Sequence, residues 1–259
     1  MTALHEAIAA GRVSVRDYLA SRPVVAEVEA IGRAIAFAAE TGCALHVVHV
    51  SSGRGVALVA QARARGVDVT CETCPHYLVL DDGDAEQLGA VAKCAPPLRP
   101  AAEREALWTA LRAGDVDLVA TDHSPAPAAL KQGDDFFAVW GGIAGAQTLL
   151  ALLYDEGVGR RGLSPATLAE LLAAAPARRF GLPGKGALDV GADADVALVD
   201  PSATWTVSRD DLLDRHRLSP FVGRALRGRV VRTILRGRTI ALDGRTVGEP
   251  CGRVLRRGA

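Results

Sequence analysis

The sequence predicts an α/β fold with parallel strands, followed by a smaller β-rich domain. Two observations support this prediction. Helix-like and strand-like segments alternate three times between residues 24 and 121, which is typical of parallel β/α units. After residue 181, short β segments separated by glycine-rich turns replace that alternation. The predicted domains are residues 1–180 and residues 181–259.

Each element of the first domain follows from its pattern of apolar residues. Residues 24–40 carry apolar side chains at spacings of three and four behind Pro23, which predicts an amphipathic helix. The β-branched run at 43–50 predicts a strand. The elements predicted next are a helix at about 55–65, a strand at 67–74, a helix at about 101–113 and a strand at 117–121.

The rest of the chain continues with helices and then changes to strands. Helices are predicted at 145–156 and 164–174, the second capped by Ser164 with Pro165 in its first turn. Beyond Gly186, the apolar runs at 194–200, 230–235 and 239–242 predict antiparallel strands.

Composition narrows the kinds of partner and the location. With 30 basic and 30 acidic residues and no net charge, the sequence predicts a small neutral substrate, with no nucleic acid and no membrane as partner. No apolar run approaches the ~20 residues that span a bilayer, and the first residues lack the basic and apolar parts of a signal peptide. Five cysteines are an odd number in a chain too large to need disulfides. We therefore expect a cytoplasmic location.

Polar side chains follow the predicted strands where each strand ends. Ser51 and Ser52 follow the first strand, His76 follows the second, and Asp122 and His123 follow the third. The carboxyl ends of parallel strands share one rim, where barrel enzymes place their sites. The sequence therefore predicts a site on this rim.

Asp122 and His123 are the first candidates on this rim. Being adjacent on a strand, they would point to opposite faces, so only one of them can face the interior. A buried carboxylate must be paired, hydrogen-bonded or bound to a metal, because an isolated buried charge is too costly. The alternative for Asp122 is a capping role in a turn.

His46 and His49 lie three apart on one predicted strand and should also point to opposite faces, so they cannot readily bind one ion together. His49 is the better candidate because it lies at the strand end, whereas packing is the alternative for either histidine. Cys71 and Cys74 have C-x-x-C spacing, but no second pair completes a zinc site.

Two loops are suited to presenting backbone N–H and C=O groups to a polar ligand. One contains Ala95 in a proline-rich stretch, and the other is the glycine-rich run Trp140-Gly141-Gly142. An ordinary loop role accounts for either of them equally well.

Taken in order, five motifs resemble those of cyclic amidohydrolases. They are Leu45–Ser52 (LHVVHVSS), Cys71–Tyr77 (CETCPHY), Lys93–Arg99 (KCAPPLR), Ala120–Pro125 (ATDHSP) and Trp140–Gly145 (WGGIAG). The tail agrees through residues 186–195 and 215–224. Within the group of allantoinase, dihydroorotase and dihydropyrimidinase (hydantoinase), the chain looks most like allantoinase.

The resemblance implies a fold and a reaction. The fold would be the C-terminal part of a (β/α)8 TIM barrel, about strands 6–8, followed by a small partial β-sandwich. The reaction would be hydrolysis of a cyclic amide of the allantoin type, in purine and ureide catabolism. The cofactor would be a divalent metal, with zinc expected, bound as a pair of ions in the complete family enzyme.

The resemblance also implies roles for single residues. His49 would take the place of the last histidine ligand, and Asp122 that of the aspartate that binds metal and acts as general base. His76 belongs to a family motif but is not a metal ligand. The residues implied to contact substrate through their backbone are Ala95, Trp140, Gly141 and Gly142.

Four of the six metal-binding groups of the family have no counterpart here. The family uses a His-x-His pair, a carboxylated lysine and a further histidine. The histidines of this chain stand at 5, 46, 49, 76, 123 and 216 and its lysines at 93, 131 and 185, and none matches. We expect that the chain begins just after the fifth strand of the barrel and is inactive alone.

Three alternatives remain open at this stage. The chain is a non-catalytic scaffold or assembly partner, or it has hydantoinase or dihydroorotase specificity, or it is a metal-free enzyme that uses Asp122 and His123. Three parallel strands cannot close a barrel. We therefore expect the exposed sheet edge to pair in a homo-oligomer or with a complementing N-terminal fragment.

Overall fold

The computed structural model describes residues 2–255, which pack as two units. The first unit comprises the residues up to 147 together with 212–220, and the second comprises 148–211 and the residues from 221 onward. The predicted boundary at residue 180 lies inside the second unit, because α8 (Leu149–Leu153) packs against the later strand β5 (Ala225–Leu235).

A three-stranded parallel sheet forms the centre of the first unit. Its strands β1 (Leu45–Val47), β2 (Val69–Thr73) and β3 (Leu118–Val119) lie in the order β1-β2-β3. This confirms the predicted α/β class with parallel strands. The strands are shorter than predicted, since the backbone leaves the extended conformation soon after β1 and β3, with φ of 44° at His49 and 45° at Asp122.

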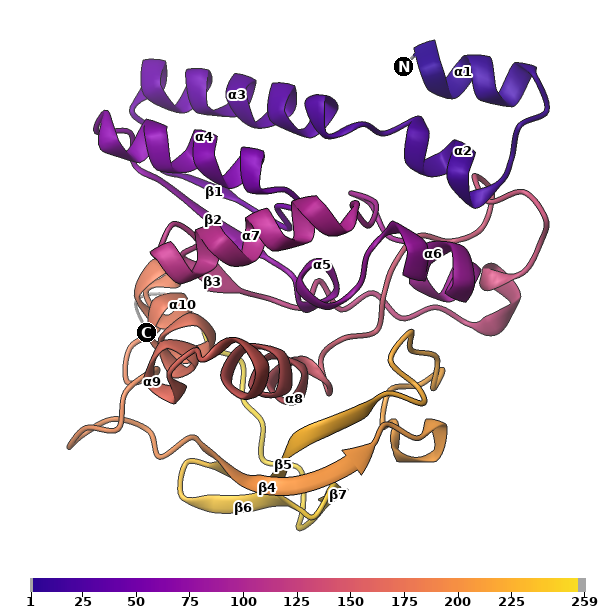
Figure 1. Ribbon diagram of the computed structural model, residues 1–259. Helices are drawn as coiled ribbons and strands as arrows, with labels where there is room; N and C mark the ends of the chain where they lie inside the picture. Colours follow the sequence, from indigo (N-terminus) through magenta and orange to yellow (C-terminus); the bar gives the residue numbers. More distant parts are fainter. Residues whose placement is uncertain (1, 256–259) are drawn as a thin grey trace. The chain divides into compact units, whose positions relative to one another are not determined.

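Three helices cover one face of this sheet (Figure 1): α3 (Val24–Thr41), α4 (Gly53–Ala64) and α7 (Ala101–Ala113). All three were predicted to within a few residues. The face of α3 that is buried carries Val24, Ile31, Ile35 and Ala38, at the spacing of three and four that predicted it. The shorter helices of this unit are α1 (Thr2–Ala9), α2 (Val15–Ala20), α5 (Pro75–Val79) and α6 (Asp82–Leu88).

The second unit begins with helices whose turns are partly widened. After α8, residues Tyr154–Arg160 form a π-helical segment. The helix α9 (Pro165–Ala169) leads through a second π-helical segment into α10 (Ala175–Phe180). Ser164 caps α9 as predicted, since its hydroxyl oxygen accepts the N–H of Thr167 at 3.0 Å.

A four-stranded antiparallel sheet completes the second unit. It consists of β4 (Val196–Thr206), β5, β6 (Arg238–Leu242) and β7 (Arg245–Thr246), paired in chain order. This confirms the predicted antiparallel strands, although β4 and β5 are longer than predicted. The structure describes one sheet in this unit, so the β-sandwich stays a prediction.

Gly228 on β5 leaves no room for a side chain. A Cβ at this position would lie 2.3 Å from Tyr154 Cδ1, and the glycine has a φ of +88°. We expect Gly228→Ala to lower the free energy of unfolding of this unit by about 2–3 kcal/mol, because the ring must move and the backbone is strained. Chemical denaturation followed by circular dichroism measures this loss.

Gly223 provides the matched control. It has a φ of +87° but no atom within 4 Å of its would-be Cβ, so Gly223→Ala carries the backbone strain without the clash. An equal loss of stability in both variants would show that contact with Tyr154 has no part in the effect.

Within residues 2–255, none of the helices combines the length and the apolar character that a membrane crossing requires.

Candidate functional site

The polar residues that were predicted to share one rim follow the carboxyl ends of the three parallel strands. Strand β1 leads into His49, β2 into Cys74 and His76, and β3 into Asp122. Hydrogen bonds continue the sheet past the strands, from Val50 N to Glu72 O at 2.8 Å and from Ala120 N to Thr73 O at 3.0 Å. His49, His76 and Asp122 therefore follow the carboxyl ends of three neighbouring strands of one sheet.

His49 and Asp122 share an unusual backbone conformation. Their φ angles of 44° and 45° lie in the left-handed region, which costs a residue other than glycine roughly 1–2 kcal/mol. Such strain concentrates at functional sites, where the surrounding structure holds a side chain in a required direction. His49 and Asp122, which the sequence analysis selected for their chemistry, thus both have a strained backbone.

A neutral thiol lies close to Asp122. Burial, and secondly the Asp122 carboxylate, raises the pKa of Cys74 well above its usual value. Burial, and secondly Asp117, raises the pKa of Cys71 to about 12. Both thiols are therefore protonated at neutral pH, and neither acts as a reactive thiolate.

His76 is a buried histidine beside His49. Its side chain is 2% exposed, and neither ring nitrogen has a hydrogen-bond partner within the described residues. Burial, and secondly the proximity of His49, lowers the pKa of His76 to about 3, so the ring is neutral. Tyr77 packs edge-on against it, with ring centroids 4.3 Å apart.

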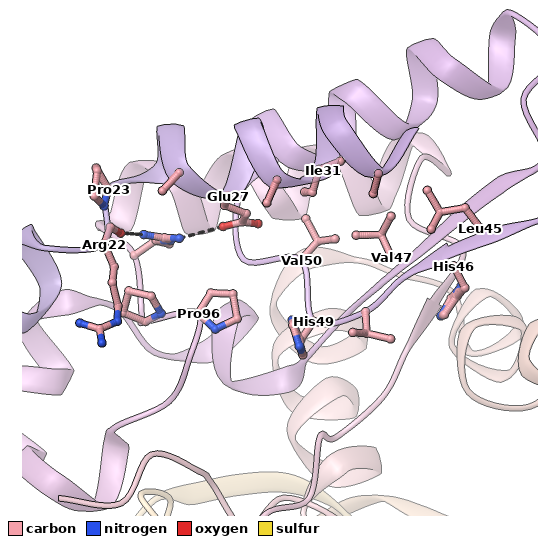
Figure 2. Close-up of a pocket in the computed structure, with 16 residues that line it drawn as sticks. Arg22, Pro23, Glu27, Ile31, Leu45, His46, Val47, His49, Val50 and Pro96 are labelled. Atoms are coloured by element: carbon pink, nitrogen blue, oxygen red, sulfur yellow. Dashed lines mark hydrogen bonds and ion pairs between the residues drawn. The ribbon is translucent and has the colours of Figure 1, made fainter. Parts of the chain in front are cut away.

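Both ring nitrogens of His46 are bonded to β2. Nδ1 lies 2.7 Å from Thr70 Oγ1, and Nε2 lies 3.1 Å from Glu72 Oε2. This supports the packing alternative for His46. The expectation that His46 and His49 point to opposite faces is wrong, because both point away from α3 (Figure 2). His49 lies beyond the end of β1, where its left-handed backbone ends the alternation of a strand.

A cavity of about 480 Å³ lies between α3, β1 and the loop at Pro96 (Figure 2). Its walls are mainly apolar, and His49 and Glu27 contribute polar groups to them. The lining residues are Arg22, Pro23, Ala26, Glu27, Ala30, Ile31, Ala34, Leu45, His46, Val47, Val48, His49, Val50, Pro96, Pro97 and Arg99.

A buried ion pair fixes the loop that follows His49. Arg99 Nη2 donates to Glu27 Oε2 at 2.8 Å, and the two side chains are only 6% and 7% exposed. Arg99 Nε donates to Ser51 Oγ, and Glu27 also accepts the N–H and the hydroxyl of Ser51. Sequence reasoning missed this pair, since its members are 72 positions apart and form no local pattern.

The first predicted substrate loop bends at a cis peptide bond between Ala95 and Pro96. Ala95 is exposed, and Tyr77 Oη donates to Pro96 O at 2.7 Å. The loop is thereby attached to the residue that packs on His76. Pro96 of this loop and His49 line the same cavity.

Several backbone groups of the second predicted substrate loop are already hydrogen-bonded to residues elsewhere in the chain. The N–H of Trp140 donates to Leu130 O, and that of Gly142 donates to Lys93 O at 2.8 Å. Lys131 Nζ donates to the carbonyl of Gly142 at 2.7 Å. Burial lowers the pKa of both Lys93 and Lys131 to about 8. The N–H of Gly142 is therefore already occupied, whereas the exposed Gly141 has no such bond among the described residues.

The residues at the rim do not by themselves fit a catalytic metal. Within the described part of the chain, no three His, Cys, Asp or Glu side chains are grouped so that they could hold an ion. His49 and Asp122 are two candidate ligands, whereas a catalytic zinc usually takes three from the protein. Amidohydrolases generally use divalent metals, so this rim supplies part of such a site at most.

A parallel β/α sheet with polar residues at the carboxyl ends of its strands places this unit in the α/β class, whose proteins carry their sites on that edge of the sheet. The chain belongs to the amidohydrolase family, whose pattern matches residues 5–240.

Among curated proteins, the chain is similar to allantoinases. It is 62% identical over 250 residues to the allantoinase of Rubrobacter xylanophilus, covering 96% of this chain and 55% of that protein. It is 46% identical over 235 residues to the allantoinase of Escherichia coli K12, covering 91% of this chain and 52% of that protein. The chain thus spans about half the length of these relatives.

Among solved structures, the chain is similar to hydantoinases. The L-hydantoinase (dihydropyrimidinase) of Arthrobacter aurescens superposes with a TM-score of 0.93 at 37% identity, over 96% of this chain and 56% of that one. The D-hydantoinase of a Thermus species gives a TM-score of 0.90 at 30% identity, with the same coverage.

Proposed function

We propose that this chain supplies part of the active site of a metal-dependent hydrolase that opens a cyclic amide of the allantoin type. The observation that supports this most is the pair of left-handed residues, His49 and Asp122, at the carboxyl ends of β1 and β3. Similarity to allantoinases at up to 62% identity supports the ring substrate and a place in purine catabolism.

Each residue on the rim has its own proposed role. Asp122 is the general base, because a carboxylate at a strand end can take a proton from the attacking water and return it to the leaving nitrogen. His49 and Asp122 are two ligands of a divalent metal, with zinc expected. Ala95, Trp140, Gly141 and Gly142 are the proposed substrate contacts, made through their backbone groups.

Because His49 and Asp122 do not complete a metal site, the proposed activity needs groups from outside the described residues. A chimera tests this, in which the matching region of the Rubrobacter xylanophilus allantoinase is replaced by this chain. We expect the chimera to hydrolyse allantoin in the presence of zinc, manganese or cobalt, and the chain by itself to show no turnover. Hydrolysis by the chain alone would contradict the proposed incomplete site.

The same chimera separates the alternatives. Hydantoin or dihydroorotate hydrolysed faster than allantoin would favour the specificity of the structural neighbours, which are hydantoinases. A folded chimera without activity on any of the three rings would instead favour the non-catalytic scaffold.

The edge of the parallel sheet supports pairing with another segment. Among the described strands, β1 is the end of the order β1-β2-β3, and the apolar cavity lies along it. An edge strand beside an apolar surface is a site for strand addition. The partner is either a second copy of this chain or a complementing fragment. Light scattering distinguishes the two, because a homo-oligomer forms from the purified chain alone.

A further inference from the structure

His123 has no part in the proposed chemistry, although it directly follows Asp122. Its ring nitrogen Nδ1 lies 3.2 Å from the backbone nitrogen of Gly145 and 3.2 Å from that of Ala146, and it accepts both N–H groups. A ring nitrogen that accepts hydrogen bonds carries no proton, so a donor on this ring is Nε2. One imidazole thus fastens two consecutive amides 22 and 23 positions away.

The same two segments are joined by their backbones. His123 pairs with Ile143 in an isolated parallel bridge, and Ser124 N donates to Ile143 O at 3.0 Å. A Cβ on Gly142 would lie 2.6 Å from Ser124 Oγ and 2.7 Å from Ser124 O, so the contact leaves no space for a side chain. The segment 141–146 is therefore packed directly against the residues that follow Asp122.

The helix predicted at 145–156 begins later than predicted, after the residues that His123 binds. The N–H groups of Gly145 and Ala146 are held by His123, ahead of the first helical residue. The chain stays irregular through this stretch, and α8 begins at Leu149. The imidazole thus fastens the C-terminal end of the loop that carries Gly141 and Gly142.

We propose that His123 is a positioning residue, which holds the substrate loop 140–146 in register with Asp122 through its two accepted N–H bonds. This rests on the proposed function in one respect, namely that Asp122 is the base and the loop contacts the ring. His123 thereby fixes the position of the loop, which orients the substrate amide, relative to the Asp122 carboxylate, which moves the proton. A displacement of about 1 Å in this relative position costs roughly 100-fold in rate.

Amide hydrogen exchange on the full chain tests the hydrogen bonds without any activity. We expect His123→Leu to raise the exchange rates of the Gly145 and Ala146 amides at least 10-fold. His123→Asn should keep both within about 3-fold of wild type, because the Asn side-chain oxygen can take the place of Nδ1. The Ser124 amide, which bonds to Ile143 O, is the internal reference. Unchanged exchange in the Leu variant, or loss of protection that Asn does not restore, would overturn the proposal.

Steady-state kinetics on the chimera test the positioning role. We expect His123→Leu to lower kcat/KM for allantoin about 10- to 100-fold, with a raised KM, and His123→Asn to restore most of it. An active chimera whose Leu variant keeps wild-type kcat/KM would overturn the positioning role while the proposed function stands. An inactive chimera counts against the proposed function, and the exchange experiment still decides on the two hydrogen bonds.

Discussion

We expect Asp122→Asn to lower kcat/KM of the chimera for allantoin by at least about 10³-fold. General acid–base catalysis contributes about 10²–10⁴, and an amide can neither take the proton of the attacking water nor return it to the leaving nitrogen. The substitution is well suited to this question, because asparagine tolerates the left-handed backbone at least as well as aspartate. The φ of 45° is therefore retained, and the loss reports on the carboxylate.

Asp134→Asn is the matched control for this experiment. Asp134 is an exposed aspartate of the same unit, outside the rim. We expect its substitution to change kcat/KM less than about 2-fold, since surface changes away from such features have small effects. Should the Asp122→Asn chimera retain more than a tenth of the activity, Asp122 is not the base.

Removing the Glu27 carboxylate produces the largest loss of stability that we expect in the first unit. Glu27→Ala leaves the Arg99 guanidinium buried at 6% exposure without its ion partner, and breaking a buried pair in this way costs about 3–5 kcal/mol. Ser51 loses the acceptor for its N–H and hydroxyl at the same time. The loss is measured as the free energy of unfolding in urea.

Two further variants show whether the ion pair is the cause. Glu29→Ala, on the same helix, removes an exposed partner 3.6 Å from Arg33 and should change stability by no more than about 0.5 kcal/mol. Replacing Glu27 and Arg99 together by Leu and Met removes both charges and should recover most of the loss. A double variant as unstable as Glu27→Ala would mean that the charge left behind is not what destabilises the unit.

Local patterns predicted the helices of the first unit well. The apolar stripe of α3 and its start behind Pro23 are contained in about 18 consecutive residues, and packing does not override them. Strand lengths were overestimated, because β1 and β3 end where neighbouring strands and the turn conformations at His49 and Asp122 determine the backbone. The apolar character of a segment does not show where its hydrogen bonds to the neighbouring strand end.

The sequence predicted only those site residues that have reactive side chains and directly follow a predicted strand. His49 and Asp122 were selected in this way, but their left-handed backbone was not visible, since neither is a glycine. The Glu27–Arg99 pair and the bonds from His123 join positions far apart in the chain. The burial of His76 likewise follows from the fold and not from its motif.

The cavity beside β1 has a practical consequence. A fluorescent dye that brightens on apolar surfaces has a place to bind there, on the side where the proposed partner strand would pair. A fall in dye fluorescence during mixing with a complementing fragment would then follow assembly in real time. Dye bound beside the open edge of the sheet thus reports assembly without a covalent label and without turnover.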